Sequence, residues 1–183
     1  MASVLVPLAQ GCEELEAVTI IDLLRRADIE VTTAGLDAHP VTASRGVVLI
    51  PDTTLDNALK KEYDMVVLPG GLPGADYLDQ DKRIQNLLKK MAGDGKFTAA
   101  ICAAPKVLAN AGLLHGKRAS AYPGALEKCQ LDNVTLEPAS VVKDGNVITS
   151  RGPGTAMDFA LVLIESLAGL EKRKEVEAGL VRG

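Results

Sequence analysis

The chain has 183 residues, the size of one domain, and its 47% hydrophobic and 24% charged residues are those of an ordinary globular protein. Its net charge of −4 and its lack of Trp, with only 3 Tyr and 2 Phe, argue against a basic, base-stacking nucleic-acid surface. No apolar run reaches the ~20 residues needed to cross a bilayer, and the N-terminal residues lack a secretory signal pattern. We therefore expect a single cytoplasmic domain over residues 1–183, with neither a membrane nor a nucleic acid as partner.

Short apolar runs alternate with longer amphipathic runs along the whole chain. The apolar runs predict strands at residues 4–8, 31–35, 47–50, 65–68 and 97–101. Helical spacing predicts helices at residues 13–26, around 84–91, from 105 onward, and at 157–168 and 172–181. Residues 134–149 are expected to form a β-hairpin with its turn at 143–146. This order is typical of a three-layer α/β sandwich around a mostly parallel sheet, in which ligands bind at the carboxyl ends of the strands.

Cys102 lies directly between the strand at 97–101 and the helix that Pro105 opens. A reactive residue placed in such a strand-to-helix turn forms a nucleophile elbow, and small neighbours such as Ala103 and Ala104 permit the strained backbone. The positive end of the following helix would favour the thiolate over the thiol. The pattern alone leaves two interpretations open, a reactive nucleophile or a buried structural cysteine.

Two other segments end at the same edge of the predicted sheet. Gly70 and Gly71 follow a strand, and their backbone amides could form an oxyanion hole or simply a turn. Glu13 and Glu14 are expected at the surface as helix-start residues. Glu16 lies two residues from Glu14 and so cannot share its face of the helix. A carboxyl drawn into a pocket would have a raised pKa and could donate a hydrogen bond to a thiolate.

Motifs spread over nearly the whole chain resemble the ThiJ/PfpI family. They are Glu13–Glu16, Ser44–Val48, Leu68–Gly71, Ala99–Pro105 and Thr149–Thr155. Within that family they are most similar to the branch that holds the parkinsonism-associated deglycase and the bacterial ThiJ proteins. The resemblance implies a flavodoxin-like α/β/α sandwich that works as a homodimer and needs no cofactor or metal.

The resemblance also implies a role for each matching residue. Cys102 matches the reactive, easily oxidised cysteine, and Glu16 matches the acid that hydrogen-bonds its sulfur and moves protons. Gly71 and Ala103 match the backbone amides of the oxyanion position. The residues expected to bind substrate or an anion are Gly70, Arg45, Arg151 and Tyr122. Without the resemblance, both arginines would be interpreted as surface or capping charges.

Two positions depart from the patterns of related branches. Tyr122 stands where the human-like branch has a histidine, and Ala103 stands where protease-like members have one. The chain's histidines, His39 and His115, are expected in solvated loops. A Cys–His protease would need a histidine base, so Glu16 must move protons alone if the protein is an enzyme.

The resemblance supports more than one function. In the first hypothesis, Cys102 attacks a reactive dicarbonyl, either free methylglyoxal, which a glyoxalase III-type enzyme converts to lactate, or an adduct on a protein or nucleotide, which a deglycase removes. The alternative is a redox sensor or stress-response chaperone that uses oxidation of Cys102 and has no dedicated substrate. A biosynthetic accessory protein ranks last. Cys12 follows the first strand, and we also consider it as a resolving thiol for oxidised Cys102.

Overall fold

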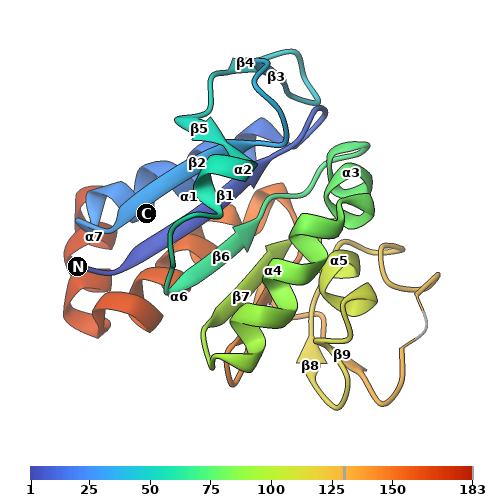
Figure 1. Ribbon diagram of the computed structural model, residues 1–183. Coiled ribbons are helices and arrows are strands. Elements are labelled where there is room, and N and C mark those ends of the chain that lie inside the picture. Colours follow the sequence, from blue (N-terminus) through green and yellow to red (C-terminus); the bar gives the residue numbers. More distant parts are fainter. Residues whose placement is uncertain (130, 183) are drawn as a thin grey trace.

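A seven-stranded sheet forms the middle layer of the computed structural model, which describes residues 1–129 and 131–182 (Figure 1). Its strand order is β10-β11-β7-β6-β1-β2-β5, and β10 pairs antiparallel with β11 whereas the other neighbours pair in parallel. The strands are β1 (Ser3–Leu8), β2 (Glu30–Gly35), β5 (Thr53–Thr54), β6 (Met65–Leu68), β7 (Phe97–Ile101), β10 (Val141–Asp144) and β11 (Val147–Ser150). The expected mostly parallel α/β sandwich is confirmed.

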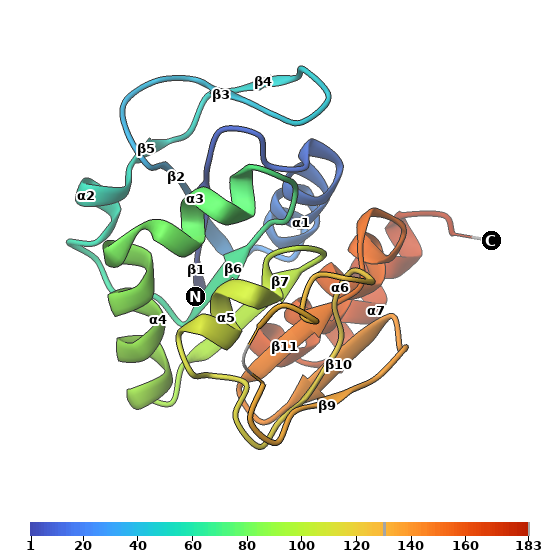
Figure 2. The ribbon, with the colours of Figure 1, turned by 90° about the vertical axis from the view of Figure 1, so that its right-hand side faces the viewer.

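Helices cover both faces of this sheet (Figures 1 and 2). One face is covered by α1 (Glu14–Arg26) and α6 (Ala156–Ala168), which follows the short turn η1 (Pro153–Thr155), with α7 (Leu170–Gly179) packed against α6. The other face carries α2 (Leu55–Ala58), α3 (Gly74–Gln80), α4 (Lys82–Gly93) and α5 (Pro105–Asn110). Two small sheets lie outside the main one: β3 (Val41–Thr42) with β4 (Val48–Leu49), and β8 (Arg118–Ala119) with β9 (Thr135–Leu136).

The core consists of two apolar layers, one on each face of the sheet. In β1, Val4, Val6 and Leu8 pack toward α1 and α6, whereas Leu5 packs toward the opposite helices. This alternation follows from the two-residue period of a strand. Each fully buried aliphatic side chain contributes roughly 1.5–3 kcal/mol, so the layers hold the carboxyl ends of β1, β6 and β7 in fixed relative positions.

Two predicted segments differ from the structure, and one helix was missed. The hairpin is shorter than expected, because Pro138 has no N–H to continue a ladder, and the upstream Thr135–Leu136 pairs instead with β8. The strand expected at 47–50 pairs with β3 in a separate projection, not in the main sheet. The helix α3 was not predicted, because its start at Pro73 and Gly74 has the composition of a turn. None of the helices in the described parts of the chain combines the length and apolarity needed to span a membrane.

Candidate active site

Cys102 occupies a strained turn at the end of β7. Its φ of 64° lies in the left-handed region that residues other than glycine rarely adopt. Hydrogen bonds hold both sides of the residue, because its N–H donates to the Ser150 carbonyl (3.0 Å) and its carbonyl accepts from the Tyr122 N–H (2.9 Å). The side chain is 9% exposed. The structure therefore places Cys102 in the elbow that the sequence predicts, buried but reachable.

Glu16 lies in the first turn of α1 and is fully buried. Its Oε2 accepts a hydrogen bond from the Gly70 N–H (2.8 Å), whereas Oε1 has no hydrogen-bond partner among the described residues. A buried carboxylate oxygen without a partner is costly, and a protonated Oε1 would remove that cost if it donated to a neighbour. The Cys102 side chain is the neighbour close enough to act on the Glu16 carboxyl.

Gly70 and Gly71 bring these two side chains together. A Cβ on Gly70 would lie 2.6 Å from the Cys102 Cβ and 2.8 Å from Glu16 Oε2, so only glycine fits between them. Gly71 has a φ of +87° and packs against the loop that precedes α1, where a Cβ would lie 2.4 Å from the Glu13 nitrogen. The amides of Gly71 and Ala103 hydrogen-bond to the Cys102 thiol group, which acts to lower its pKa. The predicted oxyanion amides therefore do lie at the cysteine.

Cys102 and Glu16 act on each other's pKa values in opposite directions. Burial raises the pKa of Glu16 to about 7, with a smaller contribution from the charge of Glu13, whereas hydrogen bonds from the Gly70 N–H and the Cys102 thiol act to lower it. Burial also raises the pKa of Cys102 to about 12, and the charge of an ionised Glu16 adds to that effect. Two negative charges at this separation disfavour each other, so the pair retains a proton at neutral pH. The amides of Gly71 and Ala103 alone therefore do not produce a thiolate here. A thiolate is favoured only when Glu16 carries the proton of the pair.

The acidic start of α1 is hydrogen-bonded to the projection formed by residues 41–49, here called the β3–β4 arm. The Ser44 hydroxyl lies 2.8 Å from Glu13 Oε2 and 3.0 Å from Glu14 Oε2, and the Arg45 N–H donates to Glu14 Oε1 (2.9 Å). Burial acts to raise the pKa of Glu14, but hydrogen bonds from its own backbone, Ser44 and the arm backbone hold that pKa below its usual range. The expectation of a surface Glu14 is wrong, because the arm leaves it only 8% exposed. Sequence reasoning assigned no role to Ser44.

The other predicted binding residues surround the site less closely. The Arg45 side chain is exposed on the arm. Arg151 is half-buried, and its guanidinium donates to the Pro138 carbonyl (3.2 Å). Tyr122 is 54% exposed, and its ring covers Gly152, whose Cβ would meet the ring at 3.3 Å. Because the Tyr122 N–H bonds to the Cys102 carbonyl, Tyr122 is the residue of this group that the backbone fixes beside the cysteine.

Comparison with known proteins identifies the family. Residues 2–166 match the model of the DJ-1/PfpI family. This chain belongs to that family. The Drosophila melanogaster protein dj-1beta is 46% identical over 180 residues, covering 98% of this chain and 96% of that protein. Its crystal structure superposes with a TM-score of 0.94 at 45% identity, over 100% of this chain and 98% of that one.

Two further relatives are informative. The Caenorhabditis elegans glutathione-independent glyoxalase DJR-1.2 is 35% identical over 171 residues, covering 93% of this chain and 90% of that protein. The structure of Toxoplasma gondii DJ-1 in an oxidized form has a TM-score of 0.94 and 39% identity, and the match covers 100% of both chains. The resemblance inferred from the motifs is confirmed, and so is the fold.

The other cysteines and the histidines of this DJ-1/PfpI protein lie outside the Cys102–Glu16 pair. Cys12 is buried, and burial together with Glu14 and Glu13 raises the pKa of its thiol to about 12, which makes it a weak resolving thiol. His39 and His115 are exposed, as expected. Within residues 1–129 and 131–182, no three His, Cys, Asp or Glu side chains are grouped so that they could hold a metal ion.

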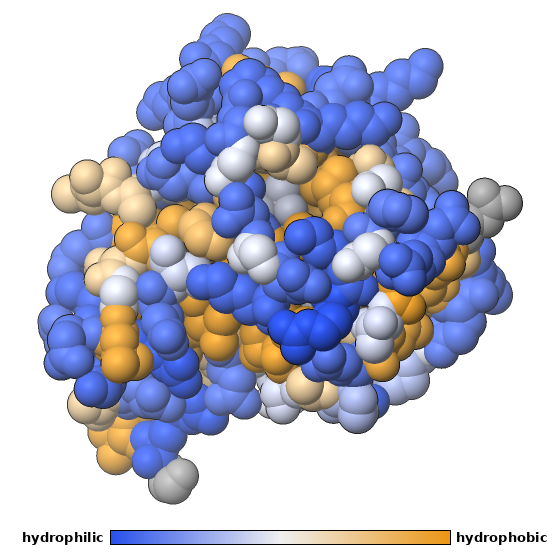
Figure 3. Space-filling view, turned by 90° about the horizontal axis from the view of Figure 1, so that it is seen from below, coloured by the Kyte–Doolittle hydropathy of each residue, from blue (hydrophilic) through white to orange (hydrophobic). Residues whose placement is uncertain are grey.

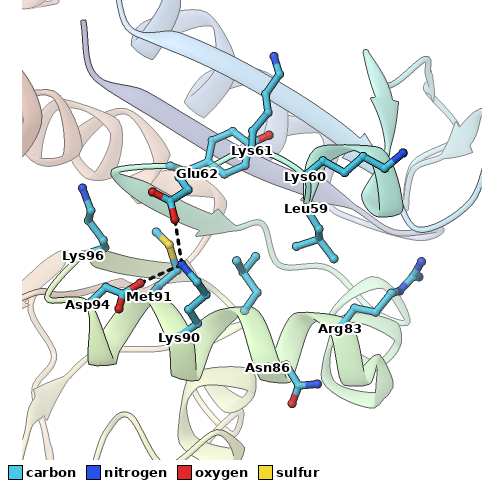
Figure 4. Close-up of a pocket in the computed structure, with 12 residues that line it drawn as sticks. Leu59, Lys60, Lys61, Glu62, Arg83, Asn86, Lys90, Met91, Asp94 and Lys96 are labelled. Atoms are coloured by element: carbon cyan, nitrogen blue, oxygen red, sulfur yellow. Dashed lines mark hydrogen bonds and ion pairs between the residues drawn. The ribbon is translucent and has the colours of Figure 1, made fainter.

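A separate cavity of about 460 Å³ lies between residues 59–63 and one face of α4 (Figure 4). Its rim is basic, but Lys90 already bridges Glu62 (3.4 Å) and Asp94 (2.9 Å). Arg83 and Lys96 are likewise paired with neighbouring aspartates. None of the predicted site residues lines this cavity, and its paired cations leave little charge for an anionic ligand. This cavity therefore lies apart from the predicted site around Cys102.

Proposed function

We propose that this protein is a cofactor-independent cysteine enzyme that acts on reactive dicarbonyls. Its substrate would be free methylglyoxal, as for a glyoxalase III-type enzyme, or the same group attached to a protein or nucleotide, as for a deglycase. The observation that carries the proposal is the convergence of the Cys102 thiol, the raised-pKa Glu16 carboxyl and the Gly71 and Ala103 amides. The glyoxalase relative from Caenorhabditis elegans supports it.

The first step joins the cysteine to the substrate. The Cys102 thiolate attacks the aldehyde carbon of methylglyoxal, a C–S bond forms, and the carbonyl electron pair moves to oxygen. The amides of Gly71 and Ala103 stabilise the oxyanion, which then takes the proton from Glu16. The product is a hemithioacetal on Cys102, with Glu16 left as a carboxylate.

The second step is an internal redox exchange that needs no external oxidant. The Glu16 carboxylate removes the proton from the former aldehyde carbon and returns it to the neighbouring carbon, while the hydroxyl proton of the hemithioacetal moves to the oxygen of the neighbouring carbonyl, which becomes a hydroxyl. The former aldehyde carbon is thereby oxidised to a thioester and its neighbour is reduced. Water then cleaves the thioester, releases lactate and regenerates Cys102. Attack on a glycated amine or thiol reaches the same intermediate once the amine or thiol leaves.

Lactate formation from methylglyoxal by the wild type and by Cys102→Ser tests the proposal. We expect turnover by the wild type, none above background by Cys102→Ser, and unchanged turnover by Cys129→Ser, which removes a half-buried thiol from outside the site. Equal turnover by the wild type and Cys102→Ser would overturn the proposal.

Oxidation sensing is the second candidate, and one observation favours it. The relative from Toxoplasma gondii has been solved in an oxidized form. In this chain, the buried Oε1 of Glu16, if protonated, could donate to an oxygen of a Cys102 sulfinate. Intact mass after peroxide treatment separates the candidates. A sensor should stop at the sulfinate in the wild type and at another oxidation level in Glu16→Ala, while reduced protein shows no lactate formation.

We also propose that the protein forms a homodimer through the face that joins α1 to the β3–β4 arm. The exposed apolar side chains of this face are Leu15 and Val18 of α1, Val47 and Val48 of the arm, and Ile50, which directly follows the arm. A cavity of about 310 Å³ between the two elements is lined by both Val18 and Ile50. The face opposite the arm is mostly hydrophilic, as Figure 3 shows. A second copy of the chain is the partner that the family resemblance implies for the apolar face.

A further inference from the structure

Glu13 lies at the junction of three elements. Its carboxylate Oε1 caps α1 by accepting from the Leu15 N–H (3.4 Å), and its own N–H donates to the Gly70 carbonyl (2.9 Å). Its Oε2 accepts from the Ser44 hydroxyl (2.8 Å), which belongs to the β3–β4 arm. The carboxylate is therefore fixed between the arm and the active-site loop, whereas a helix-start glutamate usually extends into water.

Gly70 connects Glu13 to the reactive pair. Its carbonyl accepts from the Glu13 backbone N–H, and its own N–H donates to Glu16 Oε2 (2.8 Å). On the other side, Ser44 is anchored by its own N–H, which donates to the Cys12 carbonyl (2.8 Å). A continuous set of hydrogen bonds thus runs from the arm, through Glu13 and Gly70, to Glu16 beside Cys102.

We propose that Glu13 is a positioning residue for the Cys102–Glu16 pair, and that Ser44 holds its charge in place so that the arm tunes the reactivity of the cysteine. The proposal deepens the proposed function and rests on it for its biological meaning. Because the arm also carries exposed apolar residues, a partner bound there would act on the same set of hydrogen bonds.

The charge of Glu13 acts on the pKa of Glu16, because few other ionisable side chains lie near that carboxyl. The ionisable side chains that act on the Glu16 carboxyl are Cys102 across the loop and Glu13 on its own helix, and Glu16 acts in turn on the Cys12 thiol. The side chains that α6 buries are apolar and so bring no charge to this side of α1. A nearby negative charge disfavours proton loss from either member of the pair. Removing it should therefore lower the pH at which Cys102 loses its proton.

The test is the rate at which iodoacetamide alkylates Cys102 as a function of pH, read on the Cys102 peptide by mass spectrometry. Glu13→Gln removes the charge and keeps one oxygen that can accept from the Leu15 N–H, while its NH2 group can donate to the Ser44 hydroxyl oxygen. We expect its alkylation midpoint to fall by about half a pH unit, as for one charge acting through a partly solvated site. Ser44→Ala should shift the midpoint in the same direction but by less. The Glu13 carboxylate keeps its charge but, without the Ser44 hydroxyl, turns toward water.

Glu14→Gln is the matched control. It removes an equal charge from the next residue, whose carboxylate accepts from the Arg45 N–H of the arm. Its midpoint should equal that of the wild type. A Glu13→Gln midpoint equal to that of the wild type would overturn the proposal, and so would equal shifts in Glu13→Gln and Glu14→Gln. Alkylation does not require turnover, so a protein inactive on methylglyoxal would still show the shift. Conversely, the absence of a midpoint shift in Glu13→Gln would overturn this proposal without changing the outcome of the lactate assay.

Discussion

Glu16 and Cys102 approach each other across Gly70, at a point where no side chain other than hydrogen can fit. The Gly70 N–H holds one carboxyl oxygen of Glu16, and the other oxygen has no hydrogen-bond partner among the described residues. Burial raises the pKa of this carboxyl to about 7, so at neutral pH it can take up or release a proton beside the sulfur. In the proposed function, Glu16 is therefore the proton carrier that a histidine would otherwise provide.

The raised pKa of Glu16 should make stability depend on pH. Glu16 has a pKa of about 7 in the folded protein, against 4.5 in the unfolded chain. Between these values the folded state binds more protons, so the free energy of unfolding falls as pH rises from 4.5 and levels off above 7. The loss should amount to about 3 kcal/mol. Urea unfolding at several pH values should show this fall in the wild type and a flatter curve in Glu16→Gln. Parallel curves would contradict the assignment.

Gly70→Ala should disrupt the site and the fold around it. The added Cβ would meet the Cys102 Cβ, Glu16 Oε2 and the Ile101 carbonyl at 2.6–2.8 Å, and two of these three atoms belong to the reactive pair. We expect a loss of roughly 1–3 kcal/mol of stability and slower alkylation of Cys102. Gly154→Ala is the control, because a Cβ there meets nothing within 4 Å. Equal effects of the two variants in thermal unfolding would count against the packing argument.

Tyr122 should contribute to substrate binding more than to the chemical step. Its backbone is fixed to the Cys102 carbonyl, but its ring is half-exposed over Gly152. Tyr122→Ala should therefore raise KM several-fold and change kcat less, as expected when an interaction is equal in the ground and transition states. Tyr77→Ala removes another exposed tyrosine, on α3, and should change neither constant. A large fall in kcat alone would show that Tyr122 takes part in proton transfer.

A charge on the apolar face should separate the proposed dimer. Ile50 is 82% exposed beside the β3–β4 arm, so Ile50→Asp should not harm the monomer but would bury a carboxylate between two copies. Sedimentation at micromolar concentration should show dimers for the wild type and for Leu136→Asp, which changes an exposed residue on β9, and monomers for Ile50→Asp. Wild-type monomers would contradict the dimer, and dimeric Ile50→Asp would place the interface elsewhere.

The position of Cys102 could be predicted from the sequence because the geometry of its turn is local. A strand that passes into Cys102 and then into a helix opened by Pro105 specifies the turn, and the structure has it. The position of Glu16 was partly predictable, since its spacing from Glu14 separates the two side chains. Its contact with Cys102 depends on a sheet that brings residues far apart in the chain together, and only the family resemblance could supply that.

The surroundings of the pair could not be predicted, because they depend on tertiary contacts of short polar segments. Ser44 has the appearance of a loop residue, yet it reaches two carboxylates of α1. Glu14 has the pattern of a surface helix start and is buried by the arm. Likewise, residues 47–50 have the composition of a strand, but nothing in that composition states that they pair with β3 outside the main sheet.

The most direct test of the central claim compares turnover with cysteine reactivity in Glu16→Gln. The amide of the glutamine can still donate to the sulfur, but it cannot accept or release a proton. The account predicts that Cys102 is still alkylated by iodoacetamide, whereas lactate formation from methylglyoxal falls by roughly 10²-fold or more. Lactate formation at the wild-type rate in Glu16→Gln would contradict the role of Glu16 as the proton carrier of the Cys102 site.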